Sequence, residues 1–441
     1  MRVRLLSLIT LLTLLTTGLF AMEPAHPDQP PTLDDIARDY THLVLAMGQH
    51  DADYVDAFYG PAEWKTQAAA EKKPLDAIRE EAMELFAQLA AIPLPEQTID
   101  QLRLSYLSKQ LGALEARVRI VKGERLKFDD ESRALYDAVA PTHPESHFEG
   151  ILKKLETKIL GEGPLARRYE EWRKQFIIPK EKLDAVFQLA IKECRARTLA
   201  RMKLPPNESF TVEYVTGKSW GGYNWYQGDY RSLIQVNTDL PVYVDRAVDL
   251  AAHEGYPGHH VYNVLLEKNL VRDRGWQEFT VYALFSPQSL IAEGTANYGK
   301  QVVFSDAERL KFERDVIFPA AGIDPALVRD YYAVLEMTEE LSFAVNEAAR
   351  KLINGEIDGE KAAAWLERYA LMDPARAKQR VKFIEQYRSY VINYNLGEQM
   401  VRNYIEKRIP AGGNGAADFA DAQWRLFEEL LSSPRLPSDL Q

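Results

Sequence analysis

Residues 253–260 read HEGYPGHH and hold three of the eight histidines in the chain. The first of them, His253, is followed directly by a glutamate, Glu254. Neutral imidazole is a common zinc ligand, and a carboxylate beside the metal can take a proton from a water molecule. This octapeptide therefore predicts a metal site of the kind that hydrolases use. We expect the fold to place this site where a substrate can reach it.

The spacing of the histidines does not fit a regular helix. Ligands four residues apart lie one turn from each other, but His259 and His260 lie six and seven residues after His253. Pro257 lacks a backbone N–H and its ring clashes with the preceding turn, while Gly258 adds backbone freedom. We therefore expect a break or bulge that brings a later histidine back toward His253. His259 needs the smaller insertion and is the expected ligand; His260 is the alternative ligand, or else contacts a ligand or the substrate.

A third ligand is expected from the helix that follows the octapeptide. Ser286 and Pro287 predict its first turn, because serine is a favoured N-cap and proline fits the first helical position. Glu293 lies early on this helix and is the expected ligand, and Asn297, one turn later, could orient a ligand histidine by a hydrogen bond. Two histidines and one carboxylate leave a position on zinc for water, and Glu254 would be the general base.

Three tyrosines near the C-terminus, Tyr387, Tyr390 and Tyr394, recur at helical spacing. They belong to a helix that should begin at residues 373–374 and continue past the last of them. Packing in the core explains this pattern without any function. The functional alternative is that a phenol donates to the oxyanion formed during hydrolysis; Tyr394 is the expected donor, and Tyr390 is expected to contact a ligand or the substrate. Arg388 is the expected clamp for a substrate carboxylate.

Only one part of the sequence, residues 205–237, has a clear β pattern. FTVEYVT (210–216) and SLIQVNT (232–238) alternate apolar and polar residues, which is typical of strands. The sequence between them, GKSWGGYNWYQGDYR (217–231), is rich in glycine and aromatic residues and predicts a loop or a distorted hairpin. This β element precedes the octapeptide directly, so it should lie beside the predicted site.

Tyrosines of this β element could line a substrate cleft. They are Tyr223, Tyr226 and Tyr230, and SLIQVNT could be an edge strand that pairs with an extended peptide. An ordinary structural hairpin explains the same sequence equally well.

Most of the remaining sequence has the period of helices. Apolar residues recur every three to four positions in residues 32–202 and on both sides of the octapeptide. The sequence therefore predicts a mainly α, multi-helical fold with a small β-hairpin or sheet next to the active-site helix. An N-terminal helical region (22–204) and a metal-binding catalytic region (205–441) should form one compact unit with a cleft.

Residues 1–21 have the form of a secretory signal peptide. Arg2 and Arg4 precede an apolar run that ends at Phe20, and the small residue Ala21 offers the cleavage position. The run is shorter than the roughly 20 apolar residues that span a bilayer, which disfavours an uncleaved anchor. The mature protein should therefore be secreted or periplasmic, with no stable membrane insertion.

Charge and cysteine content argue against other classes of protein. The full chain has a formal net charge of −11, and cleavage of the signal would make it more negative. An acidic exported protein is a poor candidate for binding nucleic acid or an anionic membrane. Cys194 is the only cysteine, so no intrachain disulfide can form, and its apolar surroundings predict a buried, unreactive thiol. The sequence does not indicate an oligomeric state.

HEGYPGHH, followed by AEGTANYG (292–299) and YRSYVINYNLG (387–397), resembles a bacterial family known only as a domain of unknown function. Its motif reads HExxPGHH and is followed by an EGxAxY segment. That family is similar to the gluzincin zinc peptidases. The resemblance therefore implies a metallopeptidase-like fold that binds one zinc ion and hydrolyses a peptide or a related amide.

The resemblance also implies roles for individual residues. These are His253, Glu293 and either His259 or His260 as metal ligands, and Glu254 as the catalytic carboxylate. Many members of the family have a PGQALSY-like segment where this chain has RSYVINY (388–394). Tyr394 matches the tyrosine of that segment, but its proline, glycine and glutamine are absent, so the substrate contacts of those three residues do not carry over.

Two other classes of protein are alternatives. GKSWG (217–221) fits the G-x-S-x-G pattern of serine hydrolases with Ser219 as nucleophile, but that mechanism needs a strand, a sharp turn and a helix. The glycine-rich sequence that follows it predicts no helix. The second alternative is a non-catalytic helical protein with a degenerate metal site, and the presence of Glu254 argues against it. The favoured hypothesis is an exported zinc peptidase, with aminopeptidase, carboxypeptidase and endopeptidase modes all open.

Overall fold

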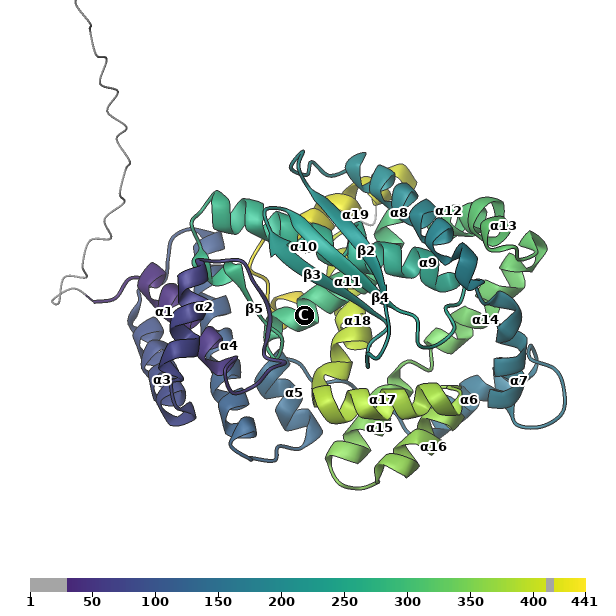
Figure 1. The fold of residues 1–441 in the computed structure, drawn as a ribbon, viewed down its shortest axis with the longest axis horizontal. Helices are drawn as coiled ribbons and strands as arrows, with labels where there is room; N and C mark the ends of the chain where they lie inside the picture. Colours follow the sequence, from purple (N-terminus) through teal and green to yellow (C-terminus); the bar gives the residue numbers. More distant parts are fainter. Residues whose placement is uncertain (1–29, 410–415) are drawn as a thin grey trace, which may run out of the picture.

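Helices make up most of the protein, and the strands are few and short (Figure 1). The structure is a computed structural model that describes residues 30–409 and 416–441. It confirms the prediction of a mainly α, multi-helical fold with a small sheet. The predicted signal peptide, residues 1–21, lies outside the described residues. Within those residues, no helix has both the length and the apolar character needed to cross a membrane.

The first helix before the β region, α1 (Leu33–Met47), has a side-chain cap at its N-terminus. Thr32 accepts a hydrogen bond from the backbone N–H of Asp35, whose carboxylate accepts one from the backbone of Thr32. Ile36, Tyr40 and Leu43 then recur on the buried face of the helix. The helices of this part are α1 (Leu33–Met47), α2 (Ala62–Glu71), α3 (Leu75–Ala91), α4 (Thr98–Val121), α5 (Phe128–Tyr136), α6 (Glu145–Glu156), α7 (Leu165–Arg173) and α8 (Leu183–Leu199).

Within residues 30–409 and 416–441, the strands form two small sheets. In the larger sheet β2 (Ser209–Val215), β4 (Arg231–Asn237) and β3 (Gly222–Gly228) lie in that order, with β2 parallel and β3 antiparallel to β4. The smaller sheet pairs β1 (Val55–Phe58) with β5 (Val281–Ala283) in antiparallel register. In Figure 1 the strands lie between α1 to α4 on one side and α8 and α9 on the other.

The β predictions are partly right. The distorted hairpin is confirmed: β3 turns back into β4 at Asp229 and Tyr230, both with positive φ, and the register shifts between Tyr226 and Gly228. The prediction that SLIQVNT is an edge strand is wrong, because this segment forms β4 in the middle of the sheet. The pair β1 and β5 was not predicted, since strands of four and three residues are too short to show an alternating pattern.

The helices after the larger sheet carry most residues of the predicted site. They are α9 (Asp245–Leu250), α10 (His259–Leu266), α11 (Pro287–Val303), α12 (Asp306–Phe312), α13 (Phe318–Ala321), α14 (Val328–Glu339), α15 (Phe343–Ile353), α16 (Gly359–Tyr369), α17 (Pro374–Tyr387), α18 (Ile392–Arg408) and α19 (Ala416–Leu431). α11 begins at Pro287, as predicted. The helix expected to continue past Tyr394 is interrupted instead: α17 ends at Tyr387, and Arg388, with a φ of 55°, starts a 3-10 turn before α18.

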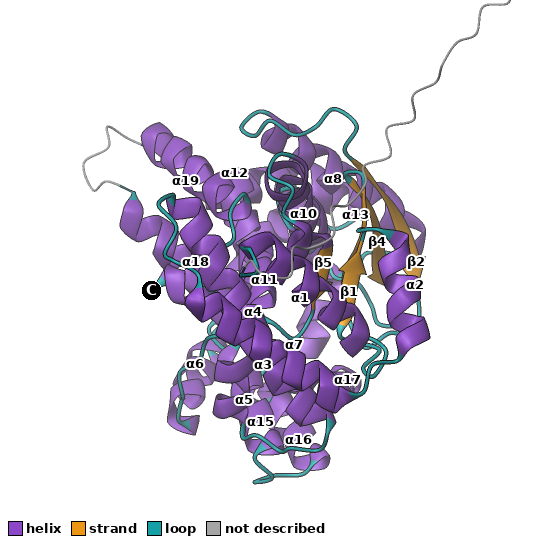
Figure 2. Ribbon diagram, turned by 90° about the vertical axis from the view of Figure 1, so that its left-hand side faces the viewer, coloured by secondary structure: helices purple, strands orange, loops and turns teal. Residues whose placement is uncertain are grey.

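One large hydrophobic core includes side chains from both expected regions of the chain. Ile36 and Leu107 come from the N-terminal helices, while Leu290, Phe427 and Leu440 come from the C-terminal part. Figure 2 shows the strands gathered at one side of the packed helices. The two regions therefore build a shared core.

α11 and α18 approach each other closely at two glycines. A Cβ on Gly294 would lie 2.5 Å from the carbonyl carbon of Gly397, so a larger residue does not fit at this contact. Gly294 therefore allows the two helices to pack closely. The contact holds Glu293 of α11 beside the segment that carries Tyr390 and Tyr394.

Candidate metal centre

The helix that carries the first histidine is interrupted within the octapeptide. α9 continues into a π-helical turn, Ala251–Gly255, and a new helix, α10, begins at His259. Between them the N–H of Gly258 donates to the carbonyl of Ala252 at 2.8 Å. A Cβ on Gly258 would lie 1.9 Å from the carbonyl oxygen of His253, so only glycine fits this bend. The predicted break is confirmed.

The break brings His253 and His259 together. Their Nε2 atoms lie 3.1 Å apart, and Oε2 of Glu293 lies 3.3 Å from the first and 3.7 Å from the second. One ligand atom from each residue lies within 4.8 Å of the others. The structure thus gathers the three residues expected as ligands, which come from the π-helical turn, α10 and α11.

His260 does not take part in this cluster. Its side chain is fully buried, with Nδ1 2.9 Å from the Ser232 hydroxyl and Nε2 2.9 Å from a carboxylate oxygen of Glu208. Both ring nitrogens are therefore occupied by protein groups, and His260 does not fit as a metal ligand. The prediction that His259 is the better candidate agrees with this geometry, and the alternative of His260 as the ligand is wrong.

Two side chains orient the candidate ligands. Nδ1 of His253 lies 2.8 Å from Oδ1 of Asn297, as predicted, and the amide of Asn297 donates to the carbonyl of Tyr394 at 2.9 Å. The hydroxyl of Tyr390 donates to Oε1 of Glu293 at 2.7 Å. Oε2 of Glu293 is left to face the histidines.

The polar atoms of the cluster fit a bound cation. Within the described part of the chain, the buried Oε2 atoms of Glu293 and Glu254 have no hydrogen-bond partner. Two imidazoles, a carboxylate and unpaired buried oxygens match the donor set of a catalytic zinc ion. Glu254 is 3% exposed and follows His253 on the π-helical turn, so it lies beside the cluster as the expected base would.

The charges of the cluster shift its proton affinities. Burial opposes protonation of His253, but its contact with Glu293 and the charges of both carboxylates raise its pKa to about 9. Burial opposes ionisation of Glu293, yet the two histidines hold its pKa well below the usual range. Burial raises the pKa of Glu254. Before a metal binds, the cluster therefore retains a proton on His253 that a metal has to displace.

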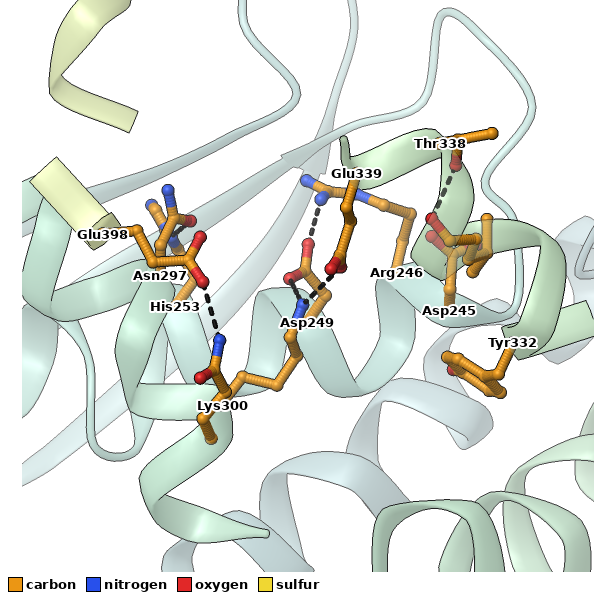
Figure 3. A network of polar contacts seen from close by, with 12 residues as sticks. Asp245, Arg246, Asp249, His253, Asn297, Lys300, Tyr332, Thr338, Glu339 and Glu398 are labelled. Carbon is orange, nitrogen blue, oxygen red and sulfur yellow. Dashed lines mark hydrogen bonds and ion pairs between the residues drawn. The ribbon is translucent and has the colours of Figure 1, made fainter. Parts of the chain in front are cut away.

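A chain of ion pairs lies next to His253 (Figure 3). Asp249, one helical turn before His253, pairs with Arg246 and with Lys300 at 3.2 Å, and Lys300 lies 3.8 Å from Glu339. The positive and negative charges alternate in this chain, so it is balanced. It links α9, α11 and α14 next to the candidate ligands.

A cavity of about 1210 Å³ lies against the cluster and is lined by Glu254, His253, His259 and Glu293 among others. Tyr394 also lines it, and no hydrogen bond among the described residues involves its hydroxyl. Burial, with the nearby charge of Glu293, raises the pKa of Tyr394, so its phenol stays protonated and can donate.

The tyrosines of the hairpin divide into different roles. Tyr223 and Tyr226 line the cavity as predicted, but the hydroxyl of Tyr223 donates to Asp56 and that of Tyr226 donates to Glu267 at 2.5 Å. Tyr230 lies in the β3–β4 turn and is not among the lining residues. The first two contribute aromatic surface to the cavity, because their hydroxyls are already bound.

Asp56 and Glu208 are acidic residues near the site that the sequence did not reveal. Asp56 of β1 lines the cavity close to His259, and burial raises its pKa to about 6. Glu208, just before β2, holds the ring of His260 and accepts from the hydroxyl of Tyr256 at 2.5 Å. Both residues reach the octapeptide from distant positions in the chain, and no local pattern marks them.

Two predicted roles are wrong. Arg388 does not face the cavity; its guanidinium donates to Glu131 at 2.6 Å, and the positive φ of its backbone directs the chain away from a continuous helix. Ser219 lies in the loop between two strands, with no helix after it, and its hydroxyl donates to Gln386 at 3.3 Å. The strand–turn–helix geometry of a serine nucleophile is therefore absent at this position.

Similarity to known proteins is found at the level of the fold. No protein-family profile and no curated protein sequence matches the chain. Among solved structures it is similar to a presumed lipoprotein from Colwellia psychrerythraea, with a TM-score of 0.50 and 14% identity, over 94% of this chain and 76% of that one. A structure named BsuCP has a TM-score of 0.47 and 11% identity, over 91% of this chain and 89% of that one. A presumed lipoprotein of unknown function from Shewanella oneidensis has a TM-score of 0.39 and 12% identity, over 91% and 88%. The first similarity supports the multi-helical fold and carries no information about the site.

Proposed function

We propose that this protein is a zinc-dependent hydrolase that cleaves peptide or related amide bonds. The observation that carries the proposal is the convergence of His253, His259 and Glu293 beside the buried Glu254 on the wall of a large cavity. Three protein ligands with a neighbouring carboxylate are the arrangement of catalytic rather than structural zinc sites. The sequence resemblance to gluzincin-like peptidases points to the same class.

In the proposed reaction a zinc ion held by these three residues would act as a Lewis acid toward the scissile carbonyl and a water molecule. Glu254 takes the proton of the attacking water and passes it to the leaving amine. The raised pKa of Glu254 suits this role, because its carboxylate accepts the proton of water more readily. The carboxyl group can then hold that proton until the amine leaves.

Tyr394 is the proposed donor to the oxyanion. Its hydroxyl is protonated, lines the cavity and has no partner among the described residues. Tyr390 has a different role, since its hydroxyl is already bound to Glu293 and fixes that ligand.

The proposed location is outside the cytoplasm, secreted or periplasmic. The form of residues 1–21 supports this, and the description of the Colwellia structure as a presumed lipoprotein agrees with it.

Metal analysis and a peptide-library digest test the proposal together. The purified protein should contain about one zinc ion per chain and should cleave peptides, and a chelator should abolish cleavage that added zinc restores. Ser219→Ala is the matched control and should leave cleavage unchanged. Chelator-resistant cleavage, or a metal-loaded protein that cleaves no peptide, would reject the proposed function.

A further inference from the structure

Arg380 is a cavity-lining arginine of α17 without an acidic partner. It is half-buried, and within the described part of the chain it takes part in no hydrogen bond or ion pair; the centre of its guanidinium lies 5.1 Å from the ring of Phe383 on the same helix. A partly desolvated cation without a counter-charge is unfavourable in a resting protein. Such a group is retained where a ligand supplies the missing anion.

The other arginines on the cavity wall differ from Arg380. Four of them form an ion pair with a carboxylate: Arg173 with Asp245 at 3.3 Å, Arg246 with Asp249, Arg376 with Asp373 at 3.1 Å, and Arg402 with Glu398 at 2.8 Å. Arg309 forms no ion pair among the described residues; burial opposes its charge, but the nearby Tyr332 and Glu313 raise its pKa, the opposite direction to Arg380. Arg380 therefore contributes a surplus positive charge to the cavity.

The charges around Arg380 strengthen this surplus. Burial lowers the pKa of its guanidinium, and the positive charges of Arg246 and Arg376 lower it further, whereas Tyr394 is the neighbour with the opposite effect. Arginine stays protonated despite such a shift. The region around Arg380 thus has a positive potential that favours an anion.

Arg380 also lies close to the reaction centre. Its guanidinium lies beside the ring of Phe383, and the centre of that ring lies 6.2 Å from the centre of the Tyr394 ring. Tyr394 also feels the charges of Glu293, Arg380 and Glu254. The proposed oxyanion donor therefore connects the unpaired guanidinium with the candidate metal cluster. A group bound by Arg380 would lie within a short distance of the bond that is cleaved.

We propose that Arg380 binds a carboxylate of the substrate, and that this carboxylate is the C-terminus of a peptide. The planar guanidinium offers two parallel N–H donors that match a carboxylate. Binding the chain end next to the reaction centre makes the protein a carboxypeptidase that removes a short C-terminal piece, while the rest of the cavity holds the preceding residues. This inference rests on the proposed peptidase function and adds the substrate class to it.

A binding experiment tests the inference without requiring turnover. The probe is a fluorescent, N-acetylated tetrapeptide, with either a free C-terminus or a C-terminal amide, added to the zinc-loaded Glu254→Gln protein. The free acid should bind about 10- to 100-fold more tightly than the amide. Arg380→Gln should remove that preference, Arg380→Lys should retain part of it, and the matched control Arg402→Gln should keep it. Equal binding of acid and amide, or a preference that survives in Arg380→Gln, overturns the inference.

A third peptide distinguishes the two sources of a carboxylate. An amidated tetrapeptide with one internal glutamate offers the carboxylate on a side chain. If it binds as tightly as the free acid, and with the same dependence on Arg380, the assignment to the C-terminus is overturned. If it binds as weakly as the plain amide, the C-terminal assignment is supported.

Hydrolysis by the wild-type protein separates this inference from the proposed function. Loss of one or a few C-terminal residues from the free acid, and not from the amide, supports both. Cleavage of both peptides at equal rates supports a peptidase and rejects the carboxylate site. Absence of all cleavage rejects the proposed function, and the binding preference still decides the role of Arg380.

Discussion

His259 and His260 are neighbours in the sequence, but they belong to two clusters of opposite character. Both ring nitrogens of His260 contact protein groups, Glu208 and Ser232, and the residue is completely buried. The ring of His259 faces His253 and a carboxylate oxygen that has no hydrogen-bond partner among the described residues. We call His260, Glu208 and Ser232 the satisfied cluster, because the polar atoms that meet there are hydrogen-bonded. We call His253, His259 and Glu293 the incomplete cluster, because a buried oxygen of Glu293 has no hydrogen-bond partner among the described residues.

The difference teaches where function is expected in a buried polar network. A cluster whose donors and acceptors are all paired stabilises the fold, because opening it would leave buried groups unsatisfied. A cluster with unpaired buried oxygens costs free energy until a ligand completes it. The cluster of His260 therefore has a structural role, and that of His259 is the candidate site.

The largest expected effect comes from the carboxylate beside the incomplete cluster. Glu254→Gln should lower peptide turnover about 10²- to 10⁴-fold, since the amide cannot accept the proton of water, and should retain zinc. Steady-state kinetics with metal analysis measures both quantities. Glu208→Gln, in the satisfied cluster, is the matched control and should keep its turnover within a few-fold. Wild-type turnover in Glu254→Gln would exclude this residue as the base.

Replacing each neighbouring histidine tests the comparison directly. In zinc-finger peptides the free energy of zinc binding is about 10–16 kcal/mol, shared by four ligands. Loss of one ligand in His259→Ala should therefore weaken zinc binding roughly 10²- to 10³-fold. His260→Ala should retain zinc but lower the free energy of unfolding by about 1–3 kcal/mol, because Glu208 loses a buried partner. Chelator competition and urea unfolding give the two values. Equal loss of zinc in both variants would contradict the division into two clusters.

A smaller effect is expected from the groups that orient the ligands. Asn297→Ala and Tyr390→Phe should each weaken zinc binding about 10- to 100-fold, since they release His253 and Glu293 respectively. Tyr226→Phe is the control, because its buried hydroxyl contacts Glu267. Competition with a zinc chelator measures all three. Unchanged affinity in both of the first variants would show that the cluster does not depend on these contacts.

The smallest expected effect is the change of zinc affinity for each unit of pH. His253 in the metal-free protein has a pKa raised to about 9, so below that pH zinc has to displace a proton. Affinity should therefore fall about tenfold for each unit of pH below 9, and rise no further above it. Chelator competition between pH 6 and pH 8 measures the slope. An affinity that stays constant over this range would mean that His253 is unprotonated before zinc arrives.

Much of the incomplete cluster could be predicted from local sequence. The octapeptide contains the residue types of a zinc site, and Pro257 and Gly258 mark the break that brings His253 and His259 together. Glu293 and Asn297 lie one turn apart on a helix whose start is marked by proline. The break and the start of α11 are confirmed, because each depends on the geometry of a single turn or a single helix, while the roles of these residues at a metal stay predictions.

Two predictions that needed contacts between distant segments failed. Arg388 was expected at the substrate, but a backbone turn with positive φ directs it to Glu131, and the cavity receives Arg380 from two turns earlier. SLIQVNT was expected at a sheet edge and lies in the centre. The position of a strand in a sheet and the partner of an arginine are set by chain segments far away in the sequence.

The sequence by itself determined the helical fold class, the interrupted helix and the identity of the candidate ligands, because hydrophobic period and backbone restrictions act over a few residues. Tertiary structure alone decided which histidine is satisfied and which is left open. The carboxylate that holds His260 comes from Glu208, and the phenol that orients Glu293 comes from Tyr390. Whether a buried polar group is paired depends on every segment packed around it, and that environment exists only once the chain has folded.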